Sequence, residues 1–204
     1  MDHSLPEPAW QRAAARTALV VVLHRAGAER VALGLVRAWA PAVPAAALST
    51  LRIADEDGVG RAWQEVASRL GRAGLNPSRL VLAGVGGAQG TALRLAFEQA
   101  ALGCAGVLAC GGIVLPLAAL GRHSSPGKPK LRLVWTADDP LSSAAALGGL
   151  LRCLRAAGLD AQGAVLPGAL SPAVEAGGGP APSLPLVRLA GAYLAELVAV
   201  ALGP

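Results

Sequence analysis

The residues best suited to chemistry stand in short loops that follow apolar runs. His24 ends the run TALVVVLH, the glycine-rich stretch GVGGAQG (84–90) follows RLVLA, and Asp139 follows KLRLVWT. Acyl transfer needs a hydroxyl or thiol that attacks, an imidazole that takes its proton and a carboxylate that orients the imidazole. These loops can act together only if the strands before them end at one edge of a sheet.

Short apolar runs alternate with amphipathic segments along the chain, which predicts alternating strands and helices. The expected strands are 17–24, 45–53, 79–85, 105–112, 130–136 and 163–167, and the expected helices are 28–39, 60–73, 89–102, 141–157 and 186–201. Because the strands are apolar throughout, they indicate a three-layer α/β sandwich, a mainly parallel sheet of about six strands with helices on both faces. The second strand is expected to flank the first on its outer side. Ligands of such sheets bind beyond the carboxyl ends of the strands near a switch point, which indicates the loops at 24–28, 84–90, 136–141 and 167–172.

Five segments resemble the α/β-hydrolase superfamily, in particular the phospholipase/carboxylesterase group that includes acyl-protein thioesterases. LVVVLHRAGA is similar to the strand and HGxG segment of that group, and GRAWQEV to its Trp-bearing helix start. RLVLAGVGGAQGTALRLAF resembles the strand, G-x-S-x-G elbow and following helix. TADDPL resembles the acid loop, and LPGALS the Y-x-G-x-x-H loop with the catalytic histidine. The resemblance runs from about residue 17 to the C-terminus and implies the α/β-hydrolase fold and ester or thioester hydrolysis.

The resemblance places the catalytic triad on residues that cannot perform its chemistry. The G-x-S-x-G elbow can be aligned with this chain in two registers. The register without a gap, which is preferred, puts the serine position at Gly86, and the register aligned on the Gln-Gly pair puts it at Ala88. The acid position falls on Asp139 and the histidine position on Ser171, and no histidine occurs after position 123. Because acyl transfer needs both a nucleophile and a base, we predict a catalytically degenerate enzyme in which none of these positions is functional.

The oxyanion loop departs from the resembled pattern as well. His24 takes the place of the structural histidine of the HG pair, but Arg25 replaces the glycine that lets the backbone turn. The remnant of the oxyanion loop is therefore His24, Arg25 and Ala26, with Gln89 beside the elbow. A working esterase or thioesterase stays open as an alternative, with a nucleophile elsewhere, among Ser142, Ser143, Ser171 and Cys110.

Composition argues against several other functions. The net charge is +5, but only two of the basic residues are lysines, and the aromatic share is 3%. Nucleic-acid binders instead cluster their cations among aromatic side chains. No nucleic-acid partner is therefore expected. The glycine stretch lacks the GK[ST] ending of a P-loop, and three cysteines without CxxC spacing indicate buried thiols rather than a disulfide or zinc site. We expect no cofactor and no metal.

The chain is expected to carry an N-terminal extension, 1–16, before a single domain at 17–204. No uninterrupted apolar run reaches the roughly 18–20 residues of a membrane helix, and the acidic, proline-bearing N-terminus is unlike a signal peptide. We predict a cytoplasmic protein without a membrane span, from a GC-rich bacterium, given its abundant Arg, Ala, Gly and Pro.

A catalytically degenerate protein of this kind would bind a small apolar or acylated ligand, or a protein partner. A third alternative is a purely structural subunit, for instance a homodimer built on the C-terminal helix.

Overall fold

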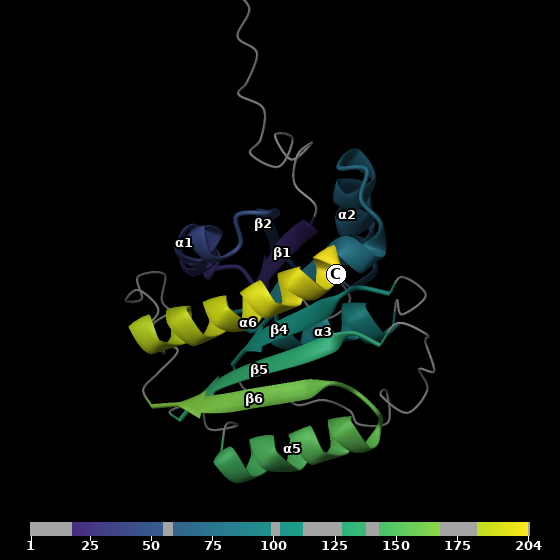
Figure 1. Ribbon diagram of the computed structural model, residues 1–204. Helices are drawn as coiled ribbons and strands as arrows, with labels where there is room; N and C mark the ends of the chain where they lie inside the picture. The colour runs from purple at the N-terminus through teal and green to yellow at the C-terminus, as the bar shows by residue number, and fades with distance from the viewer. Residues whose placement is uncertain are drawn as a thin grey trace, which may run out of the picture.

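Six parallel strands form one sheet in the order β2-β1-β3-β4-β5-β6 (Figure 1). The computed structural model describes residues 18–54, 59–98, 103–111, 128–137, 143–167 and 183–203. The strands are β1 (Ala18–His24), β2 (Ala46–Arg52), β3 (Leu80–Gly84), β4 (Gly106–Cys110), β5 (Lys130–Thr136) and β6 (Ala161–Leu166). Every neighbouring pair runs parallel, so all six carboxyl ends meet at one edge. The predicted position of the second strand outside the first is confirmed.

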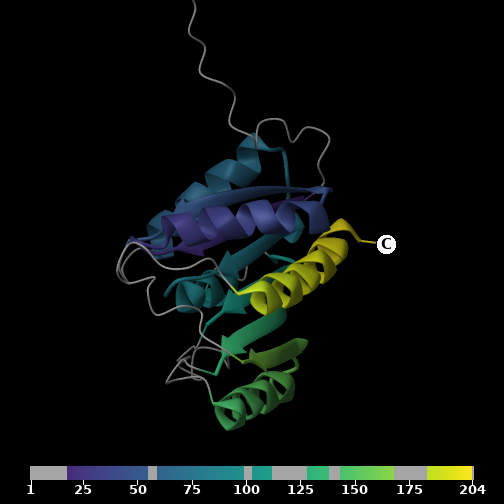
Figure 2. The ribbon, with the colours of Figure 1, turned by 90° about the vertical axis from the view of Figure 1, so that its left-hand side faces the viewer.

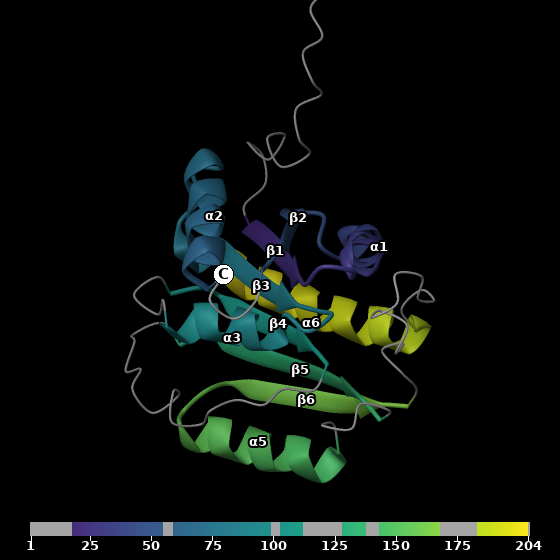
Figure 3. The same ribbon diagram turned by 180° about the vertical axis from the view of Figure 1, so that it is seen from behind.

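Helices cover both faces of the sheet. They are α1 (Glu29–Trp39), α2 (Val59–Arg72), α3 (Gln89–Glu98), α5 (Ala144–Ala156) and α6 (Leu184–Leu202), with 3-10 turns η2 (Ala40–Ala42) and η4 (Pro77–Arg79). Helices α2, α3 and α5 lie on one face of the sheet (Figure 3), where their buried apolar side chains belong to one core. Helices α1 and α6 pack on the other face, where α6 lies in front of the sheet in Figure 1. The predicted three-layer α/β sandwich is confirmed.

The element boundaries follow the sequence patterns closely. Strands β1, β3 and β4 are buried along their whole length, as continuous Val, Leu and Ala runs require. Strand β6 starts two residues earlier than the sequence predicts, because Ala161 and Gln162 pair with Leu131 and Arg132. The predicted N-terminal extension lies outside the described residues.

Helix α6 is tied to the rest of the fold by hydrogen bonds at both ends. Near its start, Trp39 Nε1 donates to the carbonyl of Val187 at 3.1 Å. At its end, Arg79 Nη1 donates to the carbonyl of Leu202 at 2.7 Å. By length and composition alone α6 could cross a membrane. In the fold its buried residues form one stripe against the sheet, namely Leu186, Ala190, Gly191, Leu194, Leu197, Val198 and Ala201.

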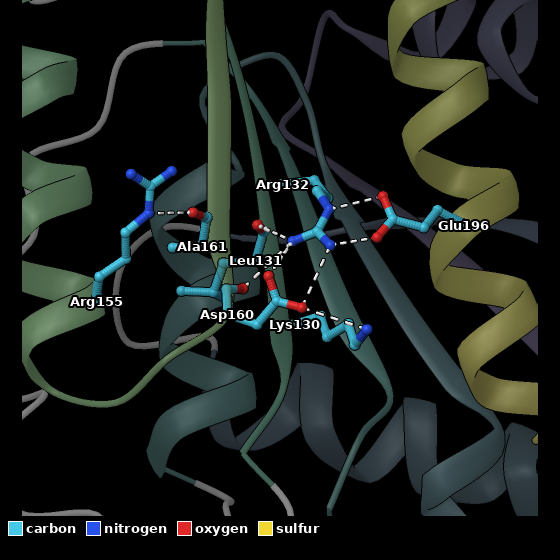
Figure 4. A network of polar contacts seen from close by, with 7 residues as sticks. All are labelled: Lys130, Leu131, Arg132, Arg155, Asp160, Ala161 and Glu196. Carbon is cyan, nitrogen blue, oxygen red and sulfur yellow. Dashed lines mark hydrogen bonds and ion pairs between the residues drawn. The ribbon is translucent and has the colours of Figure 1, made fainter.

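A buried arginine connects the middle of α6 to the sheet (Figure 4). The side chain of Arg132 on β5 is 0% exposed, and its Nε donates to Glu196 Oε2 at 2.9 Å while Nη2 pairs with Oε1. Its Nη1 donates to Asp160 Oδ1 at 3.0 Å and to the Leu131 carbonyl at 2.9 Å. Lys130 Nζ lies 3.2 Å from Asp160 Oδ2. Hydrogen bonds from Arg132 hold the pKa of both carboxylates below their ordinary values.

Each edge strand of the sheet is contacted by an arginine from a neighbouring helix. On β2, the Thr50 carbonyl accepts from Arg69 Nη1 of α2 at 2.9 Å. On β6, the Ala161 carbonyl accepts from Arg155 Nε of α5 at 2.9 Å (Figure 4). Charged side chains along edge strands oppose edge-to-edge pairing with another sheet. This arrangement disfavours a dimer formed by joining two sheets.

Candidate functional site

The turn between β3 and α3 has the backbone shape of a nucleophile elbow. Only residues 85–88 separate the end of β3 from the start of α3. Gly86 and Gly87 both adopt positive φ, +54° and +83°, a region that other L-residues seldom occupy. In the α/β-hydrolase elbow, the nucleophile stands on such a sharp and strained strand-to-helix turn. The backbone is therefore compatible with an elbow at Gly86.

The two registers considered for this elbow place the serine position in different surroundings. Gly86 is half-buried at the tip of the turn. Ala88 is 0% exposed, its N–H donates to the Val85 carbonyl at 3.1 Å, and its carbonyl accepts from Ala92 at 3.0 Å. A nucleophile has to stand exposed above the sheet. The positions of these residues fit the ungapped register, with Gly86 at the serine position, better than the alternative with Ala88.

Gly84, at the end of β3, allows α3 to approach the strand closely. A Cβ atom at this position would lie 2.6 Å from Gln89 Cα, 2.9 Å from the Ala88 carbonyl oxygen and 3.0 Å from Ala92 Cβ. Two of these three atoms belong to the backbone, so they cannot move aside as a flexible side chain would. The close packing of the end of β3 against the start of α3 thus requires glycine at position 84, the first glycine of the resembled G-x-S-x-G elbow.

The loop after β1 is turned at Gly27, which falls on the second glycine of the resembled HGxG pattern, whereas Arg25 stands at the first. His24 is 3% exposed, and its Nδ1 donates to the Arg25 carbonyl at 3.0 Å. The same carbonyl accepts from Ala28 N at 3.2 Å. Gly27 has φ +86°, and Ala26 and Gly27 are exposed. The positive φ therefore falls on the glycine of the HGxG pattern that this chain keeps, two residues after Arg25.

Arg25 joins this loop to the elbow turn. Its Nε donates to the Gly87 carbonyl at 3.0 Å, and its Cδ lies 3.1 Å from the place of a Cβ at position 87. Strands β1 and β3 are neighbours. From β1 the chain passes to β2 on one side and then to β3 on the other. The topological switch point, where ligands bind in such sheets, therefore lies between β1 and β3. Gln89 opens α3 at the same edge and is 8% exposed. The structure thus brings together Gly86, Ala88, Gln89, His24, Arg25 and Ala26.

Replacing Arg25 by alanine is expected to loosen the elbow turn. Loss of one hydrogen bond costs roughly 0.5–1.5 kcal/mol, and the low end applies because Arg25 is only half-buried. Hydrogen exchange measured by mass spectrometry should become faster in the peptide that covers residues 85–92. The matched control is Arg61→Ala on α2, an exposed position without an ion pair in the described part of the chain. Unchanged exchange at 85–92 in the Arg25 variant would contradict the connecting role.

The remaining site predictions fall largely outside the described residues. Asp139, Ser171 and Ser142 lie there, and their roles stay predictions. Of the other nucleophile candidates, Ser143 caps α5, where its Oγ accepts from Ala146 N at 3.0 Å. Burial raises the pKa of the Cys110 thiol to about 12, and a thiol protonated at neutral pH is a poor nucleophile.

The three cysteines lie in different surroundings. Burial of Cys104 and Cys110 is confirmed, whereas Cys153 is exposed, contrary to the prediction of buried thiols. Cys153 follows Arg152 on the outer side of α5, whose core-facing residues are Leu147, Leu151 and Leu154. Among the described residues, no group of three or more His, Cys, Asp or Glu side chains could hold a metal ion.

Comparison with known proteins places this arrangement in a fold class. No protein-family model and no curated protein matches the sequence, but solved structures match the fold. Esterase PE8 has 18% sequence identity and a TM-score of 0.67, over 90% of this chain and 94% of that one. A phospholipase/carboxylesterase from Dyadobacter fermentans DSM 18053 has 15% identity and a TM-score of 0.64, over 88% and 90%. The chain therefore has the α/β-hydrolase fold, as its sequence motifs predicted.

A plant protein shares the same architecture. SOBER1 from Arabidopsis thaliana has 13% identity and a TM-score of 0.54, over 91% of this chain and 99% of that one. At identities this low, the likeness establishes the fold, while activity has to be argued from the residues of this chain.

Proposed function

We propose that this protein is a catalytically degenerate, carboxylesterase-like α/β-hydrolase that binds an apolar or acylated ligand without cleaving it. The observation that carries the proposal is Gly86. It stands at the tip of the turn with φ +54°, a conformation that other L-residues seldom adopt, yet it has no side chain that could attack a carbonyl. The proposed base position is Ser171, and no histidine follows position 123 in the sequence. A site without nucleophile and base cannot form an acyl-enzyme.

The geometry of the elbow supports binding of a carbonyl group even so. In the α/β-hydrolase fold, the N–H of the residue after the nucleophile position stabilises the oxyanion, and here that residue is Gly87. Gly87 is exposed, and Arg25 engages its carbonyl oxygen rather than its N–H. A backbone donor of this kind holds a carbonyl oxygen whether or not a reaction follows. An ester, a thioester or another acyl group is therefore the ligand class that the site suits.

The purified full-length protein is expected to lack esterase turnover. General-base catalysis alone contributes roughly 10²–10⁴-fold, and a missing nucleophile removes the covalent route as well. The measurement is hydrolysis of p-nitrophenyl butyrate and of a short-chain thioester, beside calorimetric titration with decanoic acid methyl ester. Binding without turnover supports the proposal. Turnover of about 1 s⁻¹ or faster, in the range of ordinary enzymes, overturns it.

An active serine hydrolase is the second candidate, because the fold neighbours include proteins named as an esterase and a phospholipase/carboxylesterase. Ser143 is engaged as a helix cap and Cys110 is fully buried, which leaves Ser142 and Ser171 of the four nucleophile candidates. Labelling with a fluorophosphonate probe, followed by peptide mapping, distinguishes the two. A labelled serine would establish the hydrolase, whereas an unlabelled protein that binds the ester supports the degenerate site.

A further inference from the structure

The exposed large apolar side chains of the described residues all belong to one layer of the fold. They are Leu33, which is 46% exposed, Leu184 at 60% and Val200 at 37%. Leu33 lies on α1 and the other two lie on α6, and these helices pack on the same face of the sheet. This layer is therefore the one on which large apolar side chains of the described residues reach the solvent.

The two leucines of this set lie near the point where α1 meets α6. Trp39, the last residue of α1, donates from Nε1 to the Val187 carbonyl of α6 at 3.1 Å. Its Cδ1 lies 3.2 Å from the place of a Cβ at Gly191. With a rise of about 1.5 Å per residue, Leu33 lies about 9 Å along α1 from this junction and Leu184 about 4.5 Å along α6. Figure 2 shows α1 and the start of α6 on the side of the molecule that faces the viewer.

Exposed arginines accompany the leucines. Arg37 stands one helical turn after Leu33, and Arg188 stands one turn after Leu184. Both are exposed, and neither forms an ion pair with a described residue. The α1–α6 face is here defined as Leu33, Arg37, Leu184 and Arg188. It combines protruding apolar side chains with positive charge.

The carboxylates of these two helices do not neutralise that charge. Glu29 of α1 lies 3.9 Å from the guanidinium of Arg52. Glu196 of α6 is held by the buried Arg132. No other acidic residue occurs between the bounds of either helix. The described part of this surface is therefore positive and partly apolar.

We propose that the α1–α6 face docks on the surface of an anionic phospholipid bilayer. The leucines would enter the headgroup region while the arginines pair with lipid phosphates and carboxylates, which is how basic, partly apolar helix faces bind membranes. A second copy of the chain fits less well, because a two-fold contact would bring like charges together. Nucleic acid also fits less well, since leucines stand beside the arginines and Trp39 is buried. The proposal goes beyond ligand binding at the elbow and is independent of it.

Sedimentation with lipid vesicles tests the proposal on the full-length protein. It is expected to bind phosphatidylcholine vesicles that contain about 30% phosphatidylserine, and to bind at least tenfold more weakly to pure phosphatidylcholine or at about 0.5 M salt. Arg37→Gln with Arg188→Gln should weaken binding about fivefold per arginine. Leu33→Ser with Leu184→Ser should weaken it by about tenfold or more. Because all four side chains are exposed, these changes leave the fold intact.

A matched pair of arginines on the opposite layer provides the control. Arg61 on α2 and Arg152 on α5 are exposed as well, and Arg61→Gln with Arg152→Gln changes the net charge equally. Near-wild-type binding of this variant supports the α1–α6 face, and so does retained binding by Arg37→Lys with Arg188→Lys. Equal loss in the control, or no binding of wild type to anionic vesicles, overturns the proposal. A wild-type dimer that the leucine variant dissociates, or DNA binding without vesicle binding, overturns it too.

Discussion

Replacing Glu196 by alanine is expected to lower the free energy of unfolding by about 3 kcal/mol. The carboxylate accepts two hydrogen bonds from Arg132, whose side chain is 0% exposed on the strand β5. Removing one partner of a buried ion pair leaves a buried charge uncompensated, which costs roughly 3–5 kcal/mol. The lower end applies, because Glu196 is itself 39% exposed and Asp160 still contacts Arg132. Urea unfolding followed by circular dichroism measures the change.

Two comparison variants distinguish the effect of leaving the buried Arg132 unpaired from the effect of losing a charge. Glu65 on α2 pairs with Arg69 at 2.8 Å and is 42% exposed, much like Glu196, but Arg69 is 16% exposed whereas Arg132 is 0% exposed. Glu65→Ala should therefore cost below about 1 kcal/mol. Arg132→Met combined with Glu196→Leu removes both charges, and such apolar replacement of a buried pair is often neutral or stabilising. If Glu196→Ala cost no more than Glu65→Ala, the buried arginine would not need its partner.

The same ion pairs should make the folded protein less stable as the pH falls into the acid range. Hydrogen bonds from Arg132 lower the pKa of Glu196 below its ordinary 4.5 and that of Asp160 below its ordinary 3.8. The unfolded chain therefore binds protons more readily than the folded one, and the stabilisation is fully present above pH 4.5. It is lost as the pH falls below that value. The variant with Arg132→Met and Glu196→Leu should show a shallower loss of stability over the same acid range.

The sheet could be predicted from the sequence because each strand carries its own local signal. Strand β1 (Ala18–His24) is a continuous apolar run buried on both faces. Parallel pairing and the outer place of β2 follow from the alternation with helices, since crossover connections leave few topologies. These parts of the fold depend on short-range patterns.

The contacts that join distant segments could not be predicted in this way. Arg132 and Glu196 are 64 residues apart, and Arg25 and Gly87 are 62 apart, so no local pattern connects them. A signal for the first pair existed nonetheless. Arg132 interrupts an otherwise apolar strand core, and Glu196 is the single acidic residue in α6. Because an unpaired buried charge is costly, the guanidinium of Arg132 requires a carboxylate beside it, and Glu196 is the carboxylate that α6 provides.

Gly84, the first glycine of the elbow motif, is present although the chain lacks the nucleophile, and its replacement tests whether packing is the reason. Gly84→Ala is expected to lower the free energy of unfolding by about 3 kcal/mol, the upper end of the usual cost of overpacking. The new Cβ would lie 2.6 Å from Gln89 Cα and 2.9 Å from the Ala88 carbonyl oxygen. Since both are backbone atoms, relief requires α3 to move away from β3. Thermal or urea unfolding measures the loss.

Gly90→Ala, six residues further on, is the matched control. Gly90 lies inside α3, and a Cβ there would meet nothing within 4 Å. The same chemical change should therefore stabilise the protein by about 0.5 kcal/mol, because alanine favours the helix and restricts the unfolded chain. Opposite signs at positions 84 and 90 would show that packing of α3 on β3 demands the first glycine of the motif. Equal, small effects at both positions would mean that packing does not explain Gly84.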